Sequence, residues 1–347
     1  MSDSTNTPDA SGVDVAEAPP QARGRAGRIF SGAVGRNVGL IIALLLLVVV
    51  GAITAGEDFT KFSNILVILR LASVIGVVAI GMTFVITAAG IDLSVGSVLG
   101  LCSVVATLGA VQTAAEGFWP LMVFVSIAVG VITGLVNGLI IAYGKVVAFM
   151  ATLAMLVAAR GAAELISQRH TKSVINQEFL SFFRDEFLGI SWIIWIFAIV
   201  AVLAWFLLNR TTFGRRTVAI GGNATAARLA GVNVRRHTTY LYMLSGAAAG
   251  IAAIMLVSRT TAGTSTHGQL YELDAIAAVV VGGTLLAGGR GTIGGTVLGV
   301  ILFATLTNVF TQNNLSTSVQ LVAKGVIIVV AVMLQQRFAT REGTTST

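Results

Sequence analysis

The sequence predicts an all-α polytopic membrane protein with about ten transmembrane helices and an internal repeat. Of its 347 residues, 55% are hydrophobic and only 11% are charged, and the mean hydropathy is +0.89. Soluble domains carry about a quarter charged residues, so this composition argues against a soluble protein. A membrane-spanning helix needs about 20 apolar residues, and the chain has room for about ten of them with their loops.

Ten apolar segments follow one another along the chain and are predicted to span the membrane. Their bounds are 38–56, 71–89, 94–114, 118–142, 146–166, 191–208, 239–258, 273–288, 292–311 and 319–336. The first is too long for the apolar core of a signal peptide, so we expect it to stay in the mature protein. The eighth is short and rich in glycine at its end, which predicts a broken or partly re-entrant helix.

Residues 37–337 are predicted to form one transmembrane domain between two tails. Residues 1–36 have a small and polar composition without apolar periodicity, which predicts a disordered tail, and residues 338–347 form a short C-terminal tail. With the N-terminus inside, about fourteen basic residues lie on that side and about six on the other. The positive-inside rule thus predicts cytosolic termini, and it explains the net charge of +7 better than nucleic-acid binding does.

A polar, glycine-rich motif separates the second and third predicted spans. It contains Gly90, Asp92, Ser94 and Gly96. A carboxylate is costly in lipid, so it faces protein or water and often marks a transport path. The alternative is a helix cap, because Asp92 and Ser94 at a helix start can satisfy free N–H groups. The two interpretations are compatible, and the sequence leaves both open.

The motif recurs in the second half of the chain. Residues 88–100 read AAGIDLSVGSVLG and residues 287–299 read AGGRGTIGGTVLG, which adds Gly288 and Gly289 to the candidate helix-breaking residues. Repeats with glycine-broken segments are common in transporters. Chance similarity of two glycine-rich helix starts is the alternative, and the sequence does not decide whether the repeat is parallel or inverted.

Other polar residues inside or beside spans have weaker signals. Asn137 either lines a path or forms a hydrogen bond between helices, and Asp274 either lines a path or caps the eighth span. Arg160 and Glu164 are four residues apart and are predicted to pair on one helix face. The three histidines lie in different loops and the single cysteine lies in an apolar run, so we expect neither a metal site nor catalytic residues.

The longest predicted cytosolic connection, residues 209–238, contains a short helix. The run Ala226–Ala230 favours a helix, with Asn223 or Thr225 as its N-cap and Gly231 as its end. Its small apolar middle fits a shallow groove on a soluble partner. The alternative is an ordinary basic loop that sets the topology.

Three blocks give this chain a family resemblance: GMTFVITAAGIDLSVGS (81–97), GGNATAARLAGVNV (221–234) and YELDAIAAVVVGGTLLAGGRGTIGGTVLG (271–299). Their order and spacing resemble the permease subunits of bacterial ATP-binding-cassette importers for simple sugars, the ribose/xylose/galactose and autoinducer-2 branch. The resemblance extends from about Asn37 to Arg337 and leaves out the N-terminal tail.

The resemblance implies a plasma-membrane permease for a monosaccharide, of the type II ABC importer fold. It implies a second permease copy in a homodimer, cytosolic ATPase subunits that bind ATP and magnesium, and an extracytoplasmic sugar-binding protein. The second block implies a coupling helix that docks on the ATPase through Ala226, Ala227, Arg228, Leu229 and Gly231. The sequence departs at Ala224, where relatives often carry an acid, and at Ala89, where they carry glycine.

Two further classes compete with this interpretation. An ion-coupled secondary transporter needs embedded acids or histidines, and only Asp92 and Glu164 qualify. Permeases for autoinducer-2, nucleosides or branched-chain amino acids share a related architecture. The chain has no GxxxxGK[ST] motif, so we expect no ATP hydrolysis by this chain and no cofactor bound to it.

Overall fold

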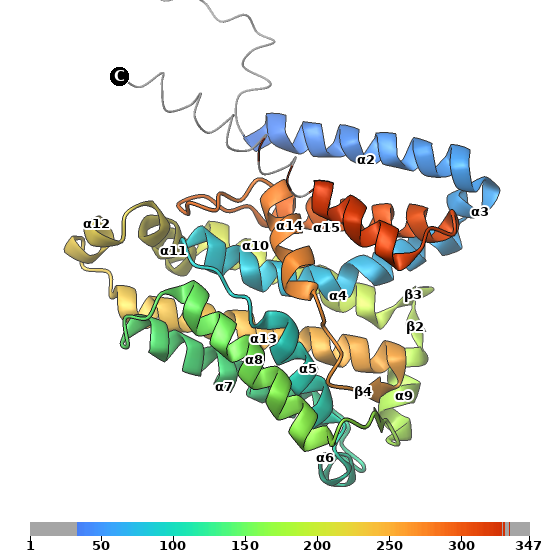
Figure 1. Cartoon of the computed structure of the whole chain (residues 1–347), viewed down its shortest axis with the longest axis horizontal. Helices are drawn as coiled ribbons and strands as arrows, with labels where there is room; N and C mark the ends of the chain where they lie inside the picture. Colours follow the sequence, from blue (N-terminus) through green and yellow to red (C-terminus); the bar gives the residue numbers. More distant parts are fainter. Residues whose placement is uncertain (1–32, 328, 330–332, 334–347) are drawn as a thin grey trace, which may run out of the picture. The chain divides into compact units, whose positions relative to one another are not determined.

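The computed structural model describes residues 33–327, 329 and 333. Seven of its helices are long and apolar enough to cross a membrane (Figure 1). They are α2 (Ala33–Ala55), α4 (Phe62–Thr87), α7 (Pro120–Ala142), α8 (Ala148–Ser167), α10 (Trp192–Arg210), α13 (Val234–Thr260) and α15 (Ile293–Gln312). The predicted tail up to residue 32, the tail 338–347 and most of the last predicted span beyond residue 327 lie outside the described residues.

Three shorter helices complete the ten predicted spans. They are α5 (Val95–Ala106), α14 (Tyr271–Val281) and a helix over Thr317–Ile327. The 12 residues of α5 and the 11 of α14 measure roughly 18 and 16 Å at 1.5 Å per residue, whereas a bilayer core is about 30 Å thick. The all-α polytopic fold is thus confirmed, with α14 short as expected for a broken helix.

Two predicted span boundaries differ from the structure by eight residues or more. The segment 94–114 is not one helix, because α5 ends at Ala106 and a separate α6 covers Gly109–Ala114. The helix α4 begins at Phe62 and not at residue 71, so Arg70 lies inside the helix. The Arg70 guanidinium reaches Glu186 at 2.7 Å, so its charge is paired without being in a loop.

Short elements connect the long helices. The helices are α3 (Glu57–Thr60), α9 (Gln177–Arg184), α11 (Thr212–Gly222) and α12 (Ala224–Leu229). Strand β1 (Lys172–Ser173) pairs antiparallel with β4 (Ala262–Gly263), and β2 (Glu186–Phe187) pairs with β3 (Ile190–Ser191). The sequence analysis missed α9 and α11. Figure 1 shows α11 and α12 at one end of the long helices and α3, α9, β2 and β3 at the other.

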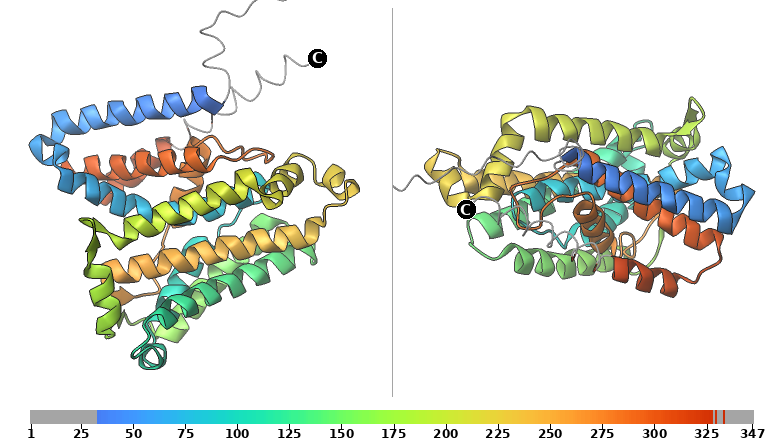
Figure 2. Two further views of the ribbon diagram at one scale, coloured as in Figure 1. Left: turned by 180° about the vertical axis from the view of Figure 1, so that it is seen from behind. Right: turned by 90° about the horizontal axis from the view of Figure 1, so that it is seen from above.

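The helices α7 and α13 lie side by side with their backbones in contact (Figure 2). A Cβ atom on Gly130 would lie 2.1 Å from the carbonyl oxygen of Gly246, and one on Gly134 would lie 2.2 Å from that of Tyr242. Glycines at four-residue spacing let helix backbones approach this closely, and Gly138 continues the row on α7. The packing of these two helices therefore depends on the absence of side chains.

We expect Gly134→Leu to force α7 and α13 apart and to destabilise the protein by about 3 kcal/mol or more, as overpacking of a tight contact does. The measurement is the thermal melting temperature of the purified protein in detergent. Gly161→Leu on α8 is the matched control, because a Cβ atom added there would have no other atom within 4 Å. Equal melting temperatures for the two variants would contradict the close contact.

The structure shows that the two copies of the repeat run in the same direction. Their loops meet at the C-terminal end of α4, where the Gly289 N–H donates to the Thr87 carbonyl oxygen at 2.9 Å. From there α15 runs antiparallel to α4, with Thr296 beside Thr83 and Asn308 beside Asn64. The helix α5 also leads away from this point, toward the segment that follows α13. The copies are therefore parallel, a point that the sequence left open.

Candidate functional site

A buried polar network surrounds Asp92 in the loop between α4 and α5. Asp92 is 2% exposed. Its Oδ1 accepts from the Ser94 N–H at 3.0 Å and from the Ser94 hydroxyl at 2.6 Å, and its Oδ2 accepts from the Ser245 hydroxyl at 2.8 Å. The first contact is a local Asx turn that opens α5, and the last ties this turn to α13. These bonds give Asp92 a structural role in the turn before α5, although no side chain makes a capping hydrogen bond at the N-terminus of α5 itself.

Asn137 on α7 joins the same network. Its Nδ2 donates to the Ser94 hydroxyl at 2.9 Å, so it links α7 to the start of α5, as the interhelical alternative predicted. Its Oδ1 is buried and has no hydrogen-bond partner among the described residues. Tyr242 donates from its hydroxyl to the Ile91 carbonyl at 3.3 Å. Two helices, α7 and α13, thus hold the 88–94 loop, and sequence analysis missed the two partners on α13.

We expect Asp92→Ala to destabilise the protein by about 2–3 kcal/mol, because it leaves the buried Ser94 and Ser245 donors without their acceptor. Asp92→Asn keeps an acceptor for Ser94 and should lose about 1 kcal/mol. Thermal melting in detergent measures both. If Asp92→Ala melts like the wild type and loses solute transport alone, Asp92 lines a path and does not serve as a cap.

The candidate helix-breaking glycines lie at close contacts, but Gly96 lies inside α5 and does not break a helix. A Cβ on Gly96 would lie 2.3 Å from the carbonyl oxygen of Gly268, and one on Gly90 would lie 2.8 Å from the Tyr242 hydroxyl. Gly288 and Gly289 have φ of +83° and +77°, a region that favours glycine. Both lie at the junction with α4 and α11. The glycines of the two repeats therefore fix the course of the loops.

This junction brings α4, α11 and the 282–292 loop together. A Cβ on Gly221 would lie 1.9 Å from the Thr87 carbonyl oxygen and 2.5 Å from the Gly289 nitrogen. On α11, the Thr217 hydroxyl lies 2.8 Å from the His237 ring nitrogen, which connects α11 to α13. We call Thr87, Gly221, Gly288 and Gly289 the glycine junction. The sequence analysis named Gly288 and Gly289 as candidate helix-breaking residues, but it did not predict their contact with Thr87 and Gly221.

Two expectations for charged groups need correction or refinement. Arg160 does not pair with Glu164, because its guanidinium donates to the carbonyl oxygens of Ser265 and His267. Glu164 pairs instead with Arg169 at 3.0 Å. Asp274 makes no capping hydrogen bond at the start of α14, and its carboxylate pairs with Lys324 at 3.2 Å.

The short helix α12 lies one residue beyond α11 and has a cap at both ends. The Asn223 side chain accepts from the Ala226 N–H at 2.9 Å. At the other end Gly231 has φ of +85°, and the N–H groups of Gly231 and Val232 donate to carbonyls inside the helix, which is the Schellman pattern. Of the two capping candidates, Asn223 is the one used, and the predicted end at Gly231 is confirmed.

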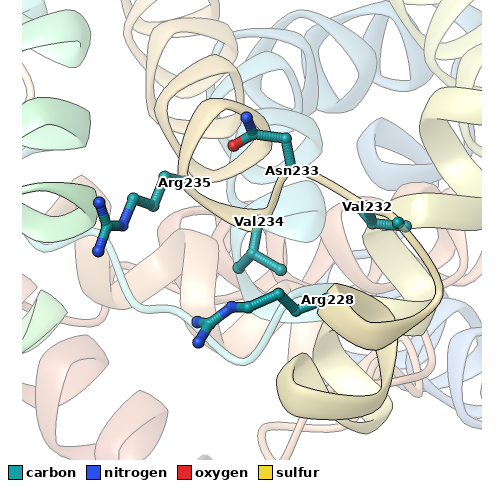
Figure 3. A pocket seen from close by; sticks show the side chains of 6 residues that line it. Arg228, Val232, Asn233, Val234 and Arg235 are labelled. Atoms are coloured by element: carbon teal, nitrogen blue, oxygen red, sulfur yellow. The ribbon is translucent and has the colours of Figure 1, made fainter.

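The residues of α12 point in different directions. Ala227 is buried against the rest of the chain, whereas Leu229 is 85% exposed and Ala226 is exposed. Arg228 lines a pocket of about 390 Å³ with Gly231–Arg235 (Figure 3). Figure 3 shows the side chains of Arg228 and Arg235 extending to the same side, with Val234 between them. Of the five predicted coupling residues, Ala227 therefore packs inward and Leu229 is the most outward.

Fold and site together define a class of protein. Apolar spanning helices, half-length helices beside glycine-rich loops and an internal repeat are features of membrane transporters. Within the residues that the structure describes, no group of three His, Cys, Asp or Glu side chains could hold a metal ion.

Comparison with known proteins identifies the family. The model of the family described as "Branched-chain amino acid transport system / permease component" matches residues 64–332. The chain is 39% identical to the ribose import permease protein of Haemophilus influenzae, with 87% of this chain and 93% of that protein covered. The chain is also 39% identical to the ribose import permease protein of Bacillus subtilis, with 89% of this chain and 96% of that protein covered. The xylose transport system permease protein of Haemophilus influenzae is 32% identical, with 85% and 94% covered.

No solved structure matches the chain. The family model alone covers well over half of its length, and the relatives are covered almost end to end. The chain therefore belongs to this family of multi-pass membrane permeases.

Proposed function

We propose that this chain is the membrane-spanning permease subunit of an ATP-driven, binding-protein-dependent importer of a monosaccharide. The observation that carries the proposal is the similarity to ribose and xylose permeases over most of the chain. Those names state the substrates of the relatives, and a pentose-like sugar is the substrate class that we assign to this chain.

The proposed assembly has three kinds of component. Two permease copies form the path through the bacterial plasma membrane, with both termini in the cytosol. An extracytoplasmic sugar-binding protein delivers the sugar from outside. Two cytosolic ATPase subunits bind ATP and magnesium, and this chain supplies neither a nucleotide site nor a cofactor.

The helix α12 is the proposed contact with the ATPase. Its exposed Leu229 and Ala226 suit a shallow groove on the partner, and the buried Ala227 holds the helix to the permease. Because α11 directly precedes α12 and packs against Thr87 and Gly289, a displacement of α12 reaches the glycine junction through one rigid element. The loops of both repeats start there, so both repeats move with it.

In this mechanism the candidate path residues act as positioning groups. Asp92, Ser94 and Asn137 hold the 88–94 loop in place through hydrogen bonds within the protein. Asp274 ties α14 to the helix that contains Lys324. Ion-coupled transport is less well supported, because the carboxylates of Asp92 and Glu164 are both engaged by protein donors.

Reconstitution tests the proposal. The permease, its ATPase and its binding protein are placed in liposomes, and uptake of labelled ribose and xylose is measured with and without internal ATP. We expect uptake to require ATP and to persist when an ionophore collapses the proton and sodium gradients. Uptake by the permease alone that follows an ion gradient would overturn the proposal, and transport of an amino acid in place of a sugar would correct the substrate class.

A further inference from the structure

A cationic pocket beside α12 has no role in the mechanism above. Two adjoining pockets share Arg228, Val234 and Arg235, and the second, of about 400 Å³, adds Lys145 and Val146 from the turn between α7 and α8. Three side chains with fixed positive charge therefore face one space from three elements. We call Lys145, Arg228 and Arg235 the basic triad.

The described elements around the pocket provide no acidic residue as a counter-charge for the basic triad. No acidic residue lies between Glu116 and Glu164, or between Glu186 and Glu272. These two stretches include α7, the 143–147 turn, α11, α12 and α13, which are the elements around the pocket. The guanidinium of Arg235 lies 5.9 Å from the ring of Tyr143, a contact that leaves its charge unneutralised. Like charges gathered without a counter-ion favour an anion from outside the chain.

The surroundings of the pocket indicate which anion. Tyr143 lies at the end of α7, where aromatic residues mark the membrane interface. A stripe of exposed apolar side chains leads from it along α7, formed by Ile132, Val136, Leu139 and Ile140. Basic pockets between helix ends on the cytoplasmic side bind anionic lipid headgroups. An acyl chain would cover the stripe while its phosphate occupies the pocket.

We propose that the basic triad binds the phosphate of an anionic phospholipid, with the acyl chains along α7. The bound lipid joins α12, α13 and the α7–α8 turn, so it holds the coupling helix to the membrane surface. Leu229 points away from this pocket into solvent, which leaves the outward face of α12 free for another partner. The inference rests on the proposed cytosolic position and coupling role of α12, and it does not depend on which solute is transported.

Native mass spectrometry of the full chain, purified in detergent and delipidated, tests the proposal. The probes are phosphatidylglycerol and phosphatidylcholine with identical acyl chains. We expect the wild type to bind phosphatidylglycerol about tenfold more tightly, and Lys145→Gln/Arg228→Gln/Arg235→Gln to lose this preference. The control Arg215→Gln/Arg216→Gln/Arg236→Gln removes the same charge from exposed positions outside the pocket and should keep it.

Four outcomes would overturn the proposal. An equal loss in both triple variants shows diffuse attraction and no site. Displacement of the lipid by millimolar inorganic phosphate shows a site for a soluble anion. A pocket variant that binds phosphatidylglycerol normally but no longer assembles with its ATPase shows a site for an acidic protein segment. If the triple variant misfolds, Lys145→Gln is measured alone, and we expect it to bind phosphatidylglycerol about threefold more weakly. Lys145→Arg should restore the binding. A normal affinity in Lys145→Gln also refutes the site.

Discussion

Gly221→Ala should strongly destabilise the protein, whereas Gly222→Ala should not. The added methyl group at Gly221 would lie 1.9 Å from the Thr87 carbonyl oxygen, so α11 has to move away from α4. The methyl group would also lie 2.5 Å from the Gly289 nitrogen, so it intrudes on the hydrogen bond that Gly289 donates to Thr87. We expect a loss of about 3 kcal/mol from overpacking and the lost hydrogen bond together. Thermal melting in detergent measures the loss.

Gly222 provides a matched control in the same helix. It is the last residue of α11, and no atom lies within 4 Å of its added methyl group. Alanine there should be neutral or should stabilise by up to about 1 kcal/mol through helix propensity. In reconstituted complexes we expect Gly221→Ala to uncouple ATP hydrolysis from sugar uptake. Equal stability and equal coupling in the two variants would show that the glycine junction transmits nothing.

Leu229→Asp is expected to weaken association with the ATPase strongly while leaving the permease folded. The side chain is 85% exposed, so the change removes no internal contact. Loss of one buried apolar anchor from an interface costs about 2 kcal/mol or more, which corresponds to roughly thirtyfold weaker binding. Co-purification with the ATPase measures association, and ATP-dependent uptake should fall by a similar factor.

Ala224→Asp is the control for added charge. Ala224 is the first residue of α12, is exposed, and occupies a position where a carboxylate interacts favourably with the helix dipole. The resemblance described above places an acid here in many relatives, so this variant should keep or strengthen association. If Leu229→Asp co-purifies with the ATPase as the wild type does, α12 is not the docking helix.

Sequence analysis predicted the features that depend on local pattern. Runs of about 20 apolar residues located the long helices, and the cap residues Asn223 and Gly231 fixed the ends of α12, because both act on backbone groups within a few residues. Hydropathy averaged over a span-length window did not resolve a break inside a span or a short amphipathic helix. It joined α5 to α6 and missed α9, whose eight residues bury Phe179 and Phe183 on one face only.

The candidate site was predicted only in part, for a different reason. Asp92 was singled out as a path residue or a helix cap, but its partner Ser245 lies 153 residues away and was not predicted. The glycine junction likewise joins α4, α11 and the 282–292 loop. Contacts of this kind depend on how helices pack in space, and spacing along one sequence carries no such information. The same limit explains why Arg160 was paired with its sequence neighbour Glu164.

The backbone contact between α7 and α13 has a consequence for how this permease moves. With no side chains between them at Gly130, Gly134 and Gly246, the two helices have no compressible layer along which to slide. The two helices therefore move as one rigid unit, and the parts of the protein that move during a transport cycle must lie on either side of it. Amide hydrogens in these two helices should exchange most slowly with solvent, whichever nucleotide the ATPase has bound.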